Sequence, residues 1–164
     1  MSDPTATPVP ESNRTFLVVV DETEEMQVAL RYASRRAKAT GGRVALLYVV
    51  DPSEFEHFMG VREIMREEKR QEAEQTLQKL ADVVVEDSGQ IPVVYLKEGN
   101  RRDELLKVLD EEPAISILVL GAGTGPDGPG PLISHLIGKA AGNIRVPITI
   151  VPGNLTQEQL DAVT

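Results

Sequence analysis

Five short apolar runs, separated by segments with helical periodicity, constrain the fold of this chain more than any other feature. The runs cover residues 16–20, 44–50, 91–96, 115–120 and 146–151. Most of them are continuous rather than alternating, which is typical of strands buried on both faces of a parallel sheet. The resulting order, β-α-β-α-β-α-β-α-β, predicts a single α/β domain with a doubly wound, five-stranded parallel sheet.

The last third of the chain gives more specific predictions. The run 115–120 is the most apolar, which favours a central position in the sheet. Leu136, Ala140 and Ile144 recur at i, i+4 and i+8 and predict a short helix. Pro147 lacks a backbone N–H, so it favours an edge position for the last strand.

The two ends of the 164-residue chain differ from its middle. Residues 1–13 combine three prolines with small polar residues and are expected to form a flexible tail rather than a signal peptide. Residues 14–152 are expected to form the domain, and 153–164 a C-terminal tail with a loose helical turn near 156–160. No apolar run approaches the roughly 18 residues of a membrane helix. With no cysteine in the chain, a cytoplasmic protein without a membrane partner is expected.

Charge and composition exclude several classes of function. Asp plus Glu is 26 and Lys plus Arg is 17, so the formal net charge is −9, and aromatic residues make up only 4%. This balance argues against a nucleic-acid partner, which needs clustered cations or stacking platforms. His57 and His135 lie in different segments with no catalytic partner at motif spacing. We therefore expect neither catalytic residues nor a metal site, and whether the protein is an enzyme stays open.

In a doubly wound sheet, ligands bind beyond the carboxyl ends of the strands. The first strand is followed by Asp21 within a run, 21–25, that holds four carboxylates. Such a run repels phosphate, but Asp21 can accept hydrogen bonds from an adenine amine or a ribose hydroxyl. The alternative is a polar strand-to-helix turn. A phosphoryl-accepting receiver domain is excluded, because the third and last strands lack the Asp and Lys it requires.

The fourth strand is followed by a loop, 121–131, that is dense in Gly and Pro. Glycines allow backbone N–H groups to approach an anion closely. The next helix is expected to begin near Ser134, so Ser134 or His135 can add a side-chain donor. The alternative is a mobile surface loop, which its composition favours.

The ordered set of segments resembles the universal stress protein family. The matching segments are Val18-Val19-Val20-Asp21, residues 46–52, Glu98-Gly99-Asn100, residues 117–121 and residues 146–151. The resemblance covers about residues 14–152. It implies a Rossmann-like, adenine-nucleotide α-hydrolase-like fold, ATP binding in some members, and a homodimer formed through the last strand. That strand comprises Pro147, Ile148, Thr149, Ile150 and Val151; a further protein partner stays unknown.

The resemblance also implies a set of site residues. Asp21 and Val44 match positions that hold the base and ribose, and Val20, beside Asp21, is included in the predicted site. The phosphates lie against G-x-x-G, nine residues and G-[ST] in members that bind ATP. The matching positions here are Gly121, Thr124, Ser134 and His135, and the neighbouring Leu120 and Gly123 are included in the predicted site. Thr124 replaces the second glycine, and Ser134-His135 replaces the last pair, so the chemistry of the phosphate site is altered.

Two functions remain open at this point. The first is a stress protein that binds an adenine nucleotide, ATP or AMP, at the carboxyl ends of the first and fourth strands. The second is a dimeric interaction or signalling module of the same fold with a degenerate ATP site. A weak ATPase is a third, less supported, reading. If nucleotide binds, Gly121→Val is expected to abolish binding without unfolding the protein.

Overall fold

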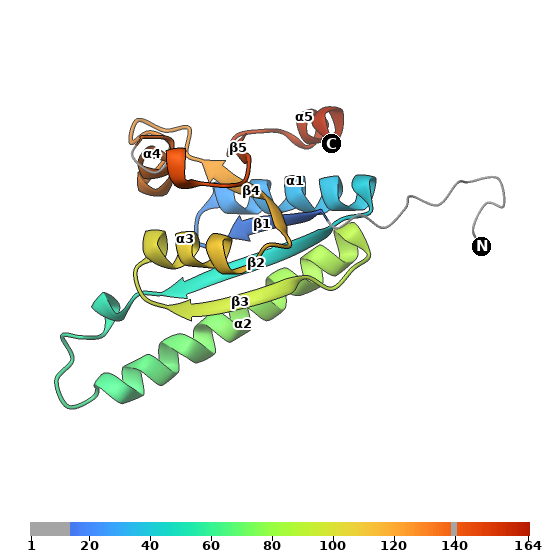
Figure 1. The fold of residues 1–164 in the computed structure, drawn as a ribbon. Helices are drawn as coiled ribbons and strands as arrows, with labels where there is room; N and C mark the ends of the chain where they lie inside the picture. Colours follow the sequence, from blue (N-terminus) through green and yellow to red (C-terminus); the bar gives the residue numbers. More distant parts are fainter. Residues whose placement is uncertain (1–13, 139–140) are drawn as a thin grey trace.

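A five-stranded parallel sheet of order β3-β2-β1-β4-β5 forms the centre of the computed structural model, which describes residues 14–138 and 141–164 (Figure 1). The strands are β1 (Thr15–Val19), β2 (Arg43–Val50), β3 (Val93–Glu98), β4 (Ile115–Ala122) and β5 (Ile148–Pro152). Every neighbouring pair is parallel. The predicted fold class is therefore confirmed. The tail expected over residues 1–13 lies outside the described residues.

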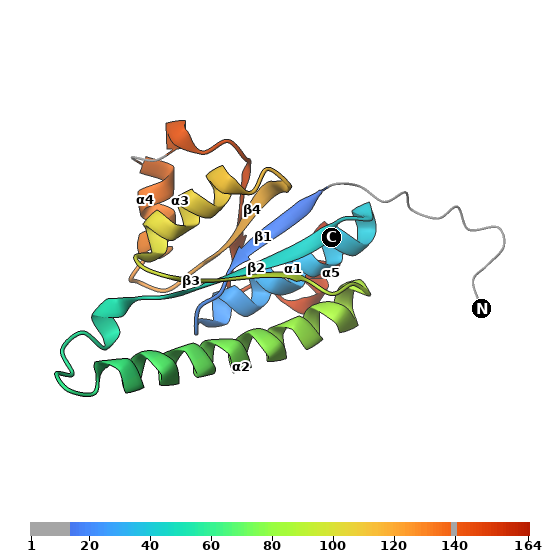
Figure 2. The ribbon, with the colours of Figure 1, turned by 60° about the horizontal axis from the view of Figure 1, so that its bottom comes forward.

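Helices cover both faces of the sheet (Figure 2). α1 (Glu24–Thr40) and α2 (Arg62–Ser88) pack on one face, and α3 (Arg101–Glu111) and α4 (Pro131–Gly138) on the other. Residues 16–19 of β1 alternate between the two cores, yet all four are nearly inaccessible, from Leu17 at 0% exposed to Val19 at 6%. This burial on both faces explains why the run is continuously apolar. No helix within the described residues is long and apolar enough to span a membrane.

The last strands and helix differ in part from the sequence-based prediction. β5 lies at an edge, as Pro147 indicates, but β1 rather than β4 holds the middle position of the sheet. α4 ends at Gly138, and a short 3-10 helix, η2 (Ala141–Asn143), follows, so Ile144 lies in neither. Ala140 lies outside the described residues.

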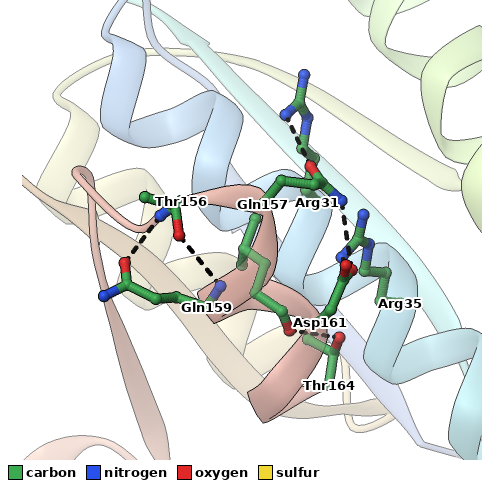
Figure 3. A network of polar contacts seen from close by, with 8 residues as sticks. Arg31, Arg35, Thr156, Gln157, Gln159, Asp161 and Thr164 are labelled. Atoms are coloured by element: carbon green, nitrogen blue, oxygen red, sulfur yellow. Dashed lines mark hydrogen bonds and ion pairs between the residues drawn. The ribbon is translucent and has the colours of Figure 1, made fainter.

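The C-terminal segment forms a helix, α5 (Gln157–Val163), that docks beside α1 (Figure 3). A capping box begins it: the Gln159 N–H donates to Thr156 Oγ1 at 3.2 Å, and the Thr156 N–H donates to Gln159 Oε1 at 2.9 Å. Leu160 is only 1% exposed. An ion pair joins Arg35 of α1 to Asp161. The helical turn expected near 156–160 is thus a helix packed onto the rest of the fold.

Arg145 donates hydrogen bonds to the connection between α3 and β4. Nε of Arg145 donates to the carbonyl oxygen of Leu109 at 2.9 Å. Its two terminal nitrogens donate to the carbonyls of Ile115, at 2.9 Å, and Glu112, at 2.7 Å. The last turn of α3 contains no basic residue of its own. Arg145 therefore supplies, from the segment before β5, the cation and donors that a helix C-terminus favours.

Candidate functional site

Two adjoining hollows lie where the parallel strands end. The first has a volume of about 400 Å³ and is built from the ends of β1 and β2 together with side chains of the η1 helix (Pro52–Glu54), α2 and α3. Its lining residues are Val20, Asp21, Glu22, Thr23, Tyr48, Val49, Val50, Glu54, Lys69, Glu72 and Arg101. The carboxyl edge of a parallel sheet is where ligands bind in such folds.

Asp21 is held in place at the first hollow by the turn that leads into α1. Its Oδ1 accepts hydrogen bonds from the backbone N–H of Thr23, at 2.9 Å, and from the Thr23 hydroxyl, at 2.5 Å. The hydroxyl of Thr23 in turn accepts from the backbone N–H of Met26 at 3.2 Å and so caps α1. Both of these bonds use Oδ1 and leave Oδ2 of Asp21 as a second acceptor. Asp21 is therefore an oriented acceptor facing the hollow.

Carboxylates outnumber cations around the first hollow. Asp21, Glu22, Glu54 and Glu72 line it, against Lys69 and Arg101. Burial raises the pKa of the Tyr48 hydroxyl above its ordinary value. The nearby carboxylates raise this pKa further, and the Lys69 ammonium partly lowers it. The electrostatics of the first hollow suit a neutral group better than a phosphate.

The second hollow, of about 290 Å³, lies between the start of α3 and the start of α4. Its lining residues are Val49, Asp51, Glu54, Asn100, Arg101, Arg102, Pro131 and Leu132. Val49, Glu54 and Arg101 also line the first hollow, so the two adjoin. Arg102 reaches across to α4, where its terminal nitrogen lies 3.2 Å from Nδ1 of His135.

The end of β4 and the glycine-rich loop that follows it pack closely against the start of α1. A Cβ atom on Gly121 would lie 2.3 Å from the carbonyl oxygen of Glu25. A Cβ on Gly123 would lie 2.8 Å from the carbonyl oxygen of Gly128 and 3.4 Å from Oε1 of Glu25. The Gly123 N–H donates to the carbonyl of Pro129 at 3.3 Å. Close packing therefore accounts for these glycines, and at least one N–H of the loop is already bonded.

The structure brings only some of the predicted site residues together. Val20 and Asp21 line the first hollow. Val44 does not lie there: it is 1% exposed near the opposite end of β2, where it pairs with Phe16. Val49, near the carboxyl end of the same strand, lines both hollows instead. The sequence contained the signal, because ligands are expected at the carboxyl end of the run 44–50 rather than at its start.

The residues predicted around the glycine-rich loop have different environments. Leu120 is 4% exposed and belongs to the core on the α3 and α4 side. Thr124 is exposed, and the Ser134 hydroxyl donates to the carbonyl of Gly130 at 3.0 Å within α4. These three residues do not line either hollow. His135 approaches the second hollow through its contact with Arg102.

The sheet order and the hollows at the strand ends define an α/β domain of the adenine-nucleotide α-hydrolase-like class. Its sheet order reverses between β1 and β4, as in doubly wound folds with a ligand edge. The model of the universal stress protein family matches residues 12–152. The chain therefore belongs to the universal stress protein family, as the resemblance implies.

Solved structures of the same family have the same fold. The universal stress protein UspA of Lactobacillus plantarum is 17% identical, with a TM-score of 0.68 over 87% of this chain and 99% of that one. The Archaeoglobus fulgidus universal stress protein in complex with dAMP is 17% identical, with a TM-score of 0.60 over 88% and 99%. A universal stress protein in complex with cAMP is 17% identical, with a TM-score of 0.56 over 86% and 98%. A search of the curated proteins gives no match.

Proposed function

We propose that this universal stress protein binds an adenine nucleotide, ATP or AMP, with the base and ribose in the first hollow. The observation that carries the proposal is the oriented carboxylate of Asp21 beside the apolar side chain of Val49 at the carboxyl edge of the sheet. A carboxylate accepts hydrogen bonds from an amine or hydroxyl, and an apolar neighbour suits a purine ring. Complexes of family structures with cAMP and dAMP support this class of ligand.

A second function, a dimeric interaction module without nucleotide, has one observation in its favour. The carboxylate of Glu25 lies beside Gly123, in the loop where the family resemblance implies phosphate binding. A carboxylate there repels phosphate, and the Gly123 N–H is already bonded to the carbonyl of Pro129. This observation weakens phosphate binding by the loop but leaves the first hollow available for a nucleoside.

Calorimetric titration with adenosine, AMP and ATP tests the proposed function. We expect binding to the wild-type protein, and we expect Asp21→Ala to weaken binding of all three at least about tenfold, because a hydrogen bond to a charged group contributes about 1.5–3 kcal/mol. Asp110→Ala, on the exposed side of α3, is the matched control and should bind normally. Thermal denaturation checks that both variants fold. If none of the three ligands gives a binding heat at millimolar concentration, the proposed nucleotide binding is wrong and the dimeric interaction module is favoured.

We further propose a homodimer formed through β5. Among the described residues this strand pairs only with β4, so its outer edge is open. Within the predicted interface segment, Pro147 and Ile150 are exposed, Ile148 and Thr149 are half-buried, and Val151 is buried. An open edge with an exposed isoleucine, Ile150 at 40% exposed, favours pairing with a second copy.

Light scattering tests this dimer. The wild-type protein should have the mass of two chains, and Ile150→Lys should shift it to the monomer, because a lysine on an edge strand opposes edge-to-edge pairing. The matched control is Val94→Lys on β3, the opposite edge strand, where Val94 is 43% exposed. A monomeric wild-type mass, or loss of the dimer only in the Val94 variant, would contradict the proposal.

A further inference from the structure

Two arginines at the second hollow lack carboxylate partners. Arg101 and Arg102 are the first residues of α3, and both are exposed. Within residues 14–138 and 141–164, neither forms an ion pair with a carboxylate. Two guanidinium groups without a carboxylate partner thus line one hollow of a chain whose net charge is −9. Guanidinium groups bind phosphate and carboxylate with paired N–H donors, so the pair favours an anionic ligand.

The contact between Arg102 and His135 adds a third donor. A guanidinium group can only donate, so in the 3.2 Å contact Nδ1 of His135 is the acceptor. In the tautomer that accepts this bond, the imidazole carries its proton on Nε2, where it can serve as a donor. α3 and α4, which lie side by side in Figure 2, thus place guanidinium and imidazole donors next to one another.

The two carboxylates that line the second hollow are engaged elsewhere. Oδ1 of Asp51 accepts from the Ser53 N–H at 2.9 Å, which begins the η1 helix. The carboxylate of Glu54 lies 3.8 Å from the Lys69 ammonium. Neither Asp51 nor Glu54 is therefore paired with an arginine. Arg101 and Arg102 remain available to an anion on the α3 side of the hollow.

We propose that Arg101, Arg102 and His135 form the phosphate subsite of this protein, and that its ligand is a nucleoside 5′-phosphate spanning both hollows. The inference rests on the proposed function, because the nucleoside half occupies the first hollow. Val49 and Arg101 line both hollows, so one ligand can contact both. The first hollow, with its excess of carboxylates, suits the neutral nucleoside half of a nucleotide. The second hollow, with its unpaired arginines, suits the anionic phosphate half. The phosphate lies against α3 and α4 rather than in the glycine-rich loop.

Comparing adenosine with AMP isolates the phosphate contribution. For the wild-type protein we expect AMP to bind at least about thirtyfold more tightly than adenosine in calorimetric titrations, as charge-assisted hydrogen bonds to two guanidinium groups require. Arg102→Ala should weaken AMP binding about tenfold, and the double variant Arg101→Ala/Arg102→Ala should remove the preference for AMP. Adenosine binding should stay unchanged in Arg102→Ala, because Arg102 lines only the second hollow and not the nucleoside hollow.

The controls separate this inference from the proposed function. Arg62→Ala removes one exposed arginine of α2 that lines neither hollow, and it should keep the full preference for AMP. The phosphate subsite would be overturned if the wild-type protein bound adenosine and AMP with equal affinity, or if the double variant still preferred AMP. In either case, binding of adenosine would still support the proposed function. Loss of the preference in Arg62→Ala would reduce the effect to net charge and also overturn it. No binding of either ligand would overturn both proposals.

Discussion

Replacing Gly121 with valine is expected to lower the free energy of unfolding by about 3 kcal/mol or more, because the new side chain has no space. A Cβ atom at this position would lie 2.3 Å from the carbonyl oxygen and 2.5 Å from the carbonyl carbon of Glu25. Both are backbone atoms in the first turn of α1, so no side-chain rotation relieves the contact. Urea unfolding followed by circular dichroism measures the loss.

The matched control is Gly125→Val, in the glycine-rich loop that follows β4. A Cβ on Gly125 meets no heavy atom within 4 Å, so this variant should stay within about 0.5–1 kcal/mol of the wild type. Equal stability of the two variants would contradict the close packing of Gly121 against Glu25. The result also bears on function: Gly121→Val is expected from sequence to remove nucleotide binding without unfolding, whereas its packing makes it a stability variant. Arg102→Ala is the cleaner probe of phosphate binding.

Shortening Leu160 to alanine is expected to cost about 2–4 kcal/mol, the usual range for a buried leucine that leaves a cavity. Leu160 is 1% exposed although it lies only four residues from the end of the chain. It is the single buried side chain of α5, so it holds that helix against the domain. The expected measurement is a lower midpoint in urea, with thermal unfolding as a second readout.

Val163→Ala serves as the control for the C-terminal helix. Val163 is 55% exposed at the end of α5, so its truncation should change stability by less than about 0.5 kcal/mol. If Leu160→Ala were equally mild, the docking of α5 would contribute nothing to stability. The family model ends at residue 152, before α5 begins. A large effect would therefore mean that a segment outside the family match stabilises the domain.

The fold was predictable because its dominant signal is local. Each strand of the sheet interior is a short apolar run, and the helical segments between them require parallel crossovers. Pro147 correctly indicated an edge strand, since a missing N–H excludes an interior one. The middle position was not predictable from the apolarity of 115–120, because β1 and β4 are both interior strands with a neighbour on each side.

The sequence predicted only those site residues that lie at the end of a single strand. Asp21 lies two residues after the end of β1, so the rule that ligands bind at the carboxyl ends of the strands locates it. Val44 was taken from the resemblance, and the same rule applied to β2 leads to Val49 instead. Contacts between distant segments could not be predicted: Arg102 and His135 are 33 positions apart, and although His135 lies at the family's phosphate motif, no motif contains Arg102. Only the packing of α3 beside α4 brings them together.

The crowding around Glu25 has a consequence for anyone who wishes to redesign this protein. Three glycines from two strand ends, Gly121, Gly123 and Gly153, pack against this one residue. A Cβ on Gly153 would lie only 2.5 Å from the Cβ of Glu25, so even alanine at position 25 keeps that contact. A wider loop, such as one engineered to enclose a triphosphate, cannot be obtained by editing the loop alone. The first turn of α1 would have to be rebuilt with it.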